Sequence, residues 1–149
     1  FDRYVIRFFR KYSVPFARLV FFVVFFWFGI LKIFPVSPAG PLVTDLLDQT
    51  FLNFIEPNLF LQIFGVFECL LGILILIPKY ERITFLLLLF HLATTVLPMF
   101  MLPHLTWDGV LIPSLIGQYI IKNSAFLALS IVLFSHLRPL TQTHKIVSV

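Results

Sequence analysis

Four stretches of the chain are apolar enough to cross a lipid bilayer. They cover residues 14–34, 59–77, 83–101 and 114–137. Each has a length within the range of about 17–25 residues that a membrane-spanning helix needs. The hydrophobic pattern therefore predicts an all-α integral membrane protein with four transmembrane helices in a single domain, residues 1–149.

The polar segments between these stretches predict how the helices are connected. Residues 78–82 allow only a tight turn, which requires antiparallel neighbours and favours a four-helix up-down bundle. In the segment 36–58, apolar residues recur at helical spacing and predict a short amphipathic helix on the outer surface. Those residues are Leu42, Leu46, Leu47, Phe51, Phe54 and Ile55. Prolines shape the spans themselves: Pro15 fits a first helical turn, whereas Pro98 and Pro103 break the end of the third span.

The distribution of basic residues predicts the orientation in the membrane. Five of the eleven Lys and Arg residues lie in the first eighteen positions, two lie between the second and third spans, and two follow the fourth span. The segments 36–58 and 102–113 contain none, and Trp107 is an aromatic anchor for the outer interface. Because basic residues gather in cytoplasmic loops, both termini are expected in the cytoplasm. Residues 1–11 mix basic and aromatic side chains, typical either of a segment attracted to anionic headgroups or of a topogenic flank.

Composition excludes several classes of function. Hydrophobic residues make up 60% of the chain and charged residues 12%, far below the roughly 25% charged residues of a soluble domain. The net charge of +4 follows from the topogenic flanks, so nucleic acid is not an expected partner. Cys69 is the single cysteine, which rules out an internal disulfide and Cys-x-x-Cys redox chemistry; it is expected to pack in the core. No secretory signal peptide is recognised.

Each predicted span carries one ionisable residue at middle to outer depth in the membrane. These residues are Lys32, Glu68, His91 and Lys122, and Gln118 shares a helix face with Lys122. Ionisable residues inside a membrane usually face the bundle interior and a partner. Gly65 and Gly72 flank Glu68 on one face and allow close helix approach. We therefore predict that these five polar residues form a site in the outer half of the bundle.

Two hypotheses describe what this layer of polar residues, one ionisable residue from each span, does. In the first, it forms a charged pocket that binds a polar or quinone-like headgroup, or transfers protons to one. In the second, Glu68 and a lysine form a buried ion pair that fixes helix register. Alternatively, the Lys32 side chain reaches outward to the membrane interface. His91 alternatively donates a hydrogen bond to a backbone carbonyl.

The histidine positions argue against a haem. His104 and His136 lie near opposite interfaces and cannot join His91 in one site. Neither a haem nor a metal is predicted, a quinone is the only cofactor considered, and no nucleophile triad or nucleotide-binding loop marks a catalytic residue.

Three segments resemble the DoxX-like small membrane proteins, particularly their YkgB branch, which is associated with reactive chlorine resistance. The resemblance lies in residues 26–34 with 37–40, in 65–68 with Gly72, and in 112–119 with Lys122. The chain has Gln118-Tyr119 and Lys122-Asn123 where that branch usually has Arg-Phe and Lys-Asp. The resemblance implies a four-helix bundle in the bacterial cytoplasmic (inner) membrane and a link to redox or respiratory metabolism.

Two functions are therefore expected. The first is a small membrane protein that binds a quinone or similar headgroup, or serves as the membrane subunit of an oxidoreductase. The alternative is a non-catalytic accessory or scaffold subunit of a larger respiratory or transport complex. Both place the chain in the lipid bilayer beside other membrane protein subunits. A small transporter is disfavoured because no discontinuous helix pair or inverted repeat is visible.

Overall fold

A computed structural model of the chain describes residues 2–34, 36–50, 52–135 and 137. The helices and strands of this part of the chain follow one another as α1 (Asp2–Ile33), α2 (Gly40–Asp48), α3 (Pro57–Ile75), the short 3-10 helix η1 (Pro78–Tyr80), α4 (Glu81–Val96), α5 (Pro98–Met101), α6 (Pro103–Thr106), β1 (Trp107–Gly109), β2 (Ile112–Pro113) and α7 (Leu115–Phe134). His136 and the polar tail that begins at Arg138 lie outside the described residues.

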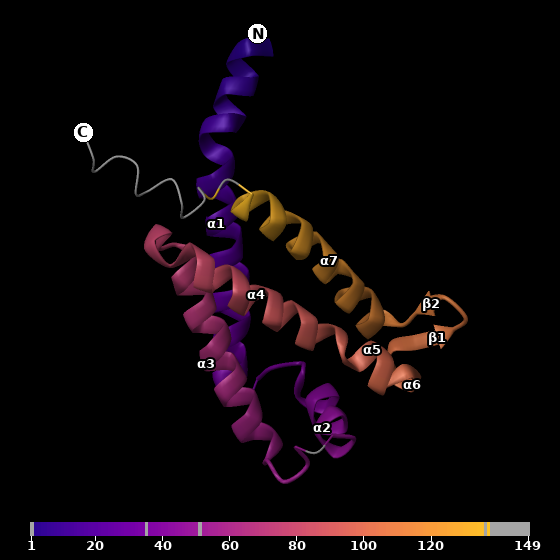
Figure 1. The fold of residues 1–149 in the computed structure, drawn as a ribbon. Helices are drawn as coiled ribbons and strands as arrows, with labels where there is room; N and C mark the ends of the chain where they lie inside the picture. Colours follow the sequence, from indigo (N-terminus) through magenta and orange to yellow (C-terminus); the bar gives the residue numbers. More distant parts are fainter. Residues whose placement is uncertain (1, 35, 51, 136, 138–149) are drawn as a thin grey trace, which may run out of the picture.

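Four helical segments are long and apolar enough to cross a membrane, which confirms the prediction of a multi-pass membrane protein. They are Asp2–Ile33, Pro57–Ile75, Pro78–Met101 and Leu115–Phe134. Successive long helices run in opposite directions, and α4 and α7 lean away from α1 toward the end that carries β1 and β2 (Figure 1). The closest pairing joins α1 to α3, while α7 packs mainly on α4.

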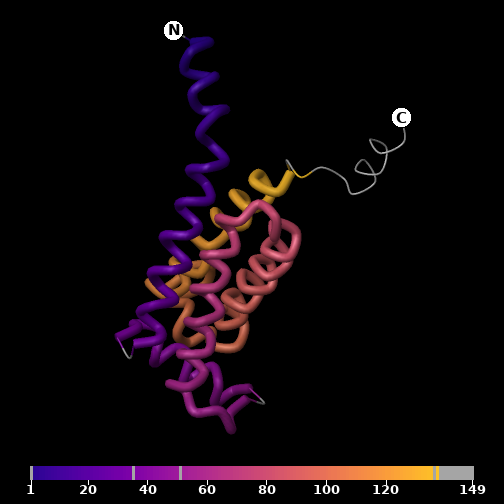
Figure 2. Tube along the Cα trace, turned by 90° about the vertical axis from the view of Figure 1, so that its left-hand side faces the viewer, coloured from indigo at the N-terminus to yellow at the C-terminus, as the bar shows by residue number. Residues whose placement is uncertain are grey.

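Helix α1 is longer than the first predicted span. The prediction placed Pro15 in a first helical turn, but α1 is one continuous helix of 32 residues with Pro15 inside it. Residues 2–14 contain no glycine or proline that would end a helix, so the helix extends through them. As a result, α1 rises well beyond the other helices at its N-terminal end (Figure 2).

Glycines allow α1 and α3 to approach closely. A Cβ atom on Gly65 would lie 2.6 Å from the carbonyl oxygen of Gly29, and one on Gly29 would lie 2.7 Å from that of Gly65. A Cβ on Gly72 would lie 3.1 Å from the backbone nitrogen of Phe26. Backbone therefore packs directly on backbone along this pair, as small residues permit between membrane helices.

Arg18 joins three helices at the opposite end of the bundle from the hairpin. Its guanidinium donates to the carbonyl oxygen of Ile75, the last residue of α3, at 3.0 Å, and forms a salt bridge with Glu81, the first residue of α4. The Ile75 carbonyl is one of the helix-end acceptors that lack a partner within their own helix. The buried apolar cluster begins beside Arg18, at Ala17, and continues along α1 through Phe21 and Phe25, together with Leu71 and Leu88.

The connections differ from the prediction in two respects. Helix α2 ends at Asp48, so the predicted amphipathic helix covers only the first half of its apolar positions; Phe54 is exposed and Phe51 lies outside the described residues. The segment 102–113 contains a helical turn and the antiparallel pair β1–β2, a local exception in a chain that is otherwise helical, as predicted. Strands of three and two residues are too short to leave a recognisable alternating pattern.

Two of the long helices, α3 and α7, begin with a side-chain cap. At α3, the Glu56 carboxylate accepts from the backbone N–H of Leu59 at 2.8 Å and of Asn58 at 3.1 Å, and these bonds hold the pKa of Glu56 below its usual value. At α7, the Ser114 hydroxyl accepts from the Gly117 N–H at 3.2 Å. Each cap satisfies donors that have no partner inside the helix, so it fixes where that helix starts.

Candidate functional site

The centre of the candidate site is an ion pair between α1 and α3. Nζ of Lys32 lies 2.5 Å from Oε2 of Glu68, and both side chains are largely buried, with 13% and 6% of their surface exposed. The glycines position this pair: a Cβ on Gly65 would lie 2.9 Å from Cβ of Lys32, so the missing side chain leaves the space that Lys32 occupies. Of the sequence hypotheses, this geometry supports an inward-facing Lys32 rather than one that reaches outward.

His91 adds a third helix to the ion pair. Nε2 of His91 lies 3.5 Å from Oε1 of Glu68, too far for a short hydrogen bond, and the contact is an ion pair only when the imidazole is protonated. The imidazole stacks on the Phe64 ring at 5.2 Å between centroids and meets the edge of Phe25 at 5.0 Å. Nδ1 of His91 is buried and has no hydrogen-bond partner among the described residues. The structure thus brings Lys32, Glu68 and His91 together in a cluster enclosed by aromatic rings.

Lys32 also lines a pocket of about 120 Å³ at the end of the bundle near α2. The other lining residues are Phe34, Ser37, Gly40, Asn58, Leu61 and Gln62. This volume is several times the roughly 10–15 Å³ that admits one water molecule. Lys32 therefore belongs both to a buried ion pair and to the wall of a pocket that also contains hydroxyl and amide groups.

Lys122 and Gln118 do not join the cluster, so the prediction of a layer with one ionisable residue from every span is wrong for α7. Both side chains are exposed. The Lys122 ammonium lies 5.1 Å from the ring centroid of Tyr119, and the Gln118 amide donates to the Pro113 carbonyl at 3.5 Å. The buried residue Ile120 stands two positions from each of them, which turns both by roughly 200° away from the packed face.

The polar contact between α7 and α4 is made by Asn123 rather than by Lys122. The Asn123 amide donates to the Thr95 hydroxyl at 3.3 Å. Thr95 in turn donates to the Leu92 carbonyl at 2.8 Å, one turn back along α4. In the sequence, Asn123 stood out only as the residue after Lys122 and as a departure from the Lys-Asp of the resembling branch, and neither observation marked it as the group that packs inward.

Cys69 is buried beside Glu68, as predicted for a packing residue. Its thiol donates to the Phe26 carbonyl at 3.6 Å, and a Cβ on Gly29 would lie 2.7 Å from its sulfur. Among the described residues, no group of three His, Cys, Asp or Glu side chains is arranged to hold a metal ion. No family model, curated protein or solved structure matches the chain.

Proposed function

We propose that this chain is a DoxX-like membrane protein of redox metabolism that binds a quinone-like headgroup in the pocket beside Lys32. The observation that carries the proposal is the position of Lys32, which lines the pocket and is paired with the buried Glu68. An ammonium donates hydrogen bonds to carbonyl oxygens, and the Asn58 and Gln62 amides supply further donors and acceptors. In this proposal the headgroup occupies the pocket of about 120 Å³, and an attached tail extends into the lipid.

Glu68 and His91 would complete the chemistry of such a site. Glu68 supplies the countercharge that keeps an ammonium stable at membrane depth. His91 contacts the second carboxylate oxygen of Glu68 and can exchange a proton through either ring nitrogen. The three residues therefore connect the pocket to a group that accepts protons, which suits a headgroup that gains protons when it is reduced.

The same proposal includes an orientation and a location. Arg18, Lys79 and Arg82 lie toward one end of the long helices, whereas residues 36–58 and 102–113 carry no basic side chain. The positive-inside rule then places both termini in the cytoplasm and the pocket in the outer half of the membrane. The resemblance to DoxX-like proteins supports the bacterial inner membrane as the location.

Quinone binding by purified protein in lipid nanodiscs tests the proposal. With a short-tailed ubiquinone or menaquinone analogue, we expect Glu68→Gln to raise the Kd about tenfold or more, a loss of at least roughly 1.4 kcal/mol. Gln62→Leu removes a polar group from the pocket wall without touching the ion pair, and we expect it to weaken binding as well. Lys122→Gln is the matched control and should bind like the wild type, since Lys122 is exposed outside the site.

If folded Glu68→Gln and Gln62→Leu proteins bind the quinone analogue as tightly as the wild type, the proposal is wrong and the ion pair only fixes the packing of α1 against α3. The second variant keeps the test decisive where Glu68→Gln fails to fold.

A second candidate function, an accessory subunit of a larger membrane complex, is favoured by the outer face of α7. Lys122, Gln118 and Tyr119 are exposed there on a helix apolar enough to span the membrane. Ionisable groups at membrane depth rarely face lipid, so this face is suited to a partner helix that carries an acidic or amide group.

Native mass measurement of the protein extracted in mild detergent distinguishes this second function from the first. For an accessory subunit, we expect wild-type protein in a complex heavier than the 17.3 kDa chain, and Lys122→Leu protein released from it. Equal masses for the two proteins would contradict a partner at this face.

A further inference from the structure

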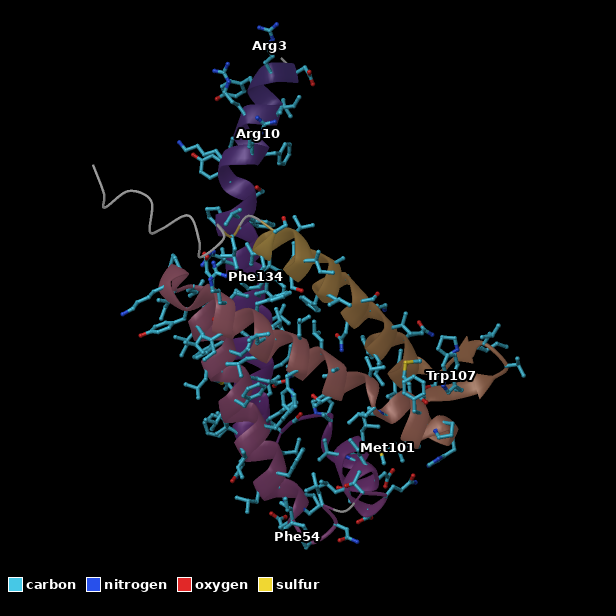
Figure 3. All side chains as sticks on the ribbon, in the orientation of Figure 1. Arg3, Arg10, Phe54, Met101, Trp107 and Phe134 are labelled. Atoms are coloured by element: carbon cyan, nitrogen blue, oxygen red, sulfur yellow. The ribbon has the colours of Figure 1, made fainter. Side chains whose placement is uncertain are left out.

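The N-terminal part of α1 extends past every other helix of the bundle. Arg3 and Arg10 mark this extension, which stands clear of the remaining helices (Figure 3). A helix of 32 residues is about 48 Å long, whereas the hydrocarbon core is about 30 Å thick. Because Arg18 is fixed to the ends of α3 and α4, the residues before it occupy the excess length. Residues 2–13 therefore lie outside the hydrocarbon core when α1 is straight.

This extension has two distinct faces. The basic face combines Arg3, Arg7, Arg10 and Lys11, which fall within an arc of about 100° at the helical turn of roughly 100° per residue. The aromatic face repeats every fourth residue through Tyr4, Phe8 and Tyr12, with Phe9 beside it. The Phe8 and Tyr12 rings are in contact, with centroids 4.8 Å apart.

In a straight helix the aromatic face would be surrounded by water. Tyr4 is 79% exposed and Phe9 is 64% exposed, and Phe8 and Tyr12 are exposed as well. Exposed apolar surface of this kind marks a site that binds a membrane or a partner. Four basic residues against the single acidic Asp2 give the segment a net charge of +3, which is complementary to an anionic surface.

We propose that residues 2–13 bind the anionic phospholipid surface of the adjoining leaflet. The aromatic face enters the boundary between headgroups and acyl chains, and the basic face contacts lipid phosphates, as in interfacial amphipathic helices. Pro15 provides the place to bend. It has no N–H, so the Lys11 carbonyl has no hydrogen-bond donor four residues later, and helices bend most readily at such positions. The bend lays the extension against the membrane without disturbing Arg18.

Spin labels report whether the extension contacts lipid or water. In a Cys69→Ala background, single cysteines at positions 3–13 are labelled and the full chain is placed in nanodiscs of equal phosphatidylcholine and phosphatidylglycerol. We expect labels at Phe8 and Tyr12 to collide preferentially with oxygen, which concentrates in lipid, and labels at Arg3 and Arg10 with a water-soluble nickel chelate. The helical period of about 3.6 residues should be visible along the scan.

Lipid charge and protein charge provide the controls. In discs of phosphatidylcholine alone, or with Arg7→Glu and Arg10→Glu combined, we expect the lipid-facing pattern to shift toward water at every position. Lys79→Glu changes a charge at the same end of the bundle and should leave the pattern intact. Three results overturn the proposal: water access on all faces in anionic discs, equal lipid burial in neutral and anionic discs, or labels shielded from both reagents by a protein partner or second copy.

Discussion

Replacing Lys32 with methionine is expected to destabilise the folded protein by about 3 kcal/mol, because it leaves the Glu68 carboxylate buried without its partner. The two groups lie 2.5 Å apart and neither has substantial contact with solvent. His91, at 3.5 Å, is too distant to replace the ammonium contact. The combined Lys32→Met and Glu68→Gln protein should recover most of the loss, since it removes the unpaired charge along with the pair.

Unfolding of purified protein in mixed micelles, followed by circular dichroism as the denaturing detergent is increased, measures these differences. The Lys122→Met protein is the control, because Lys122 is exposed and should tolerate the change within about 0.5 kcal/mol. An additive double variant would contradict the coupling between Lys32 and Glu68. So would a Lys32→Met protein as stable as the wild type.

Replacing Gly65 with alanine is expected to cost about 3 kcal/mol, at the upper end of overpacking effects. The new methyl carbon would lie 2.6 Å from the Gly29 carbonyl oxygen and 2.9 Å from Cβ of Lys32. The first of these atoms belongs to the backbone, so relief requires α1 and α3 to separate along their whole contact. That separation would also stretch the Lys32–Glu68 contact, so the quinone binding that we propose should weaken together with the stability.

Gly40→Ala is the matched control for this substitution. Apart from its chain neighbours and its own helix backbone, no described atom lies within 4 Å of a Cβ at position 40, and the residue begins α2, where alanine is a better helix former than glycine. We expect its midpoint of unfolding to equal or slightly exceed that of the wild type. A Gly65→Ala protein with an unchanged midpoint would show that the α1–α3 contact is looser than the structure has it.

The four spans and the polar cluster of Lys32, Glu68 and His91 could be predicted from the sequence, because charged residues inside apolar stretches are few and conspicuous. Lys32, Glu68 and His91 each stood out for that reason, and the glycines near Glu68 indicated its packed face. The rotation of α7 could not be predicted in the same way. Its apolar residues surround the helix on nearly all sides, so Lys122 and Asn123, adjacent in sequence, gave no sign of which one faces α4.

Other features depended on contacts between distant residues. In the sequence, Arg18 counted only as one of the five basic residues in the first eighteen positions, and its partners Ile75 and Glu81 are 57 and 63 residues away along the chain. The pocket likewise draws Lys32 from α1, Gly40 from α2 and Gln62 from α3. A hydrophobic pattern describes each helix by itself, so it does not show which side chains meet between helices.

The two attachments of α1 determine how this protein can move. Arg18 and Lys32 both belong to α1 and are about 21 Å apart along it, and each is bonded to α3 or its end. Sliding or rotating α1 against α3 would break both attachments at once, so the pair is a rigid unit. Arg18 also binds the start of α4, which makes that end a pivot. A swing of α4 and α7 about this end would have its greatest amplitude at the opposite end, beside the Lys32 pocket, and it would separate His91 from Glu68.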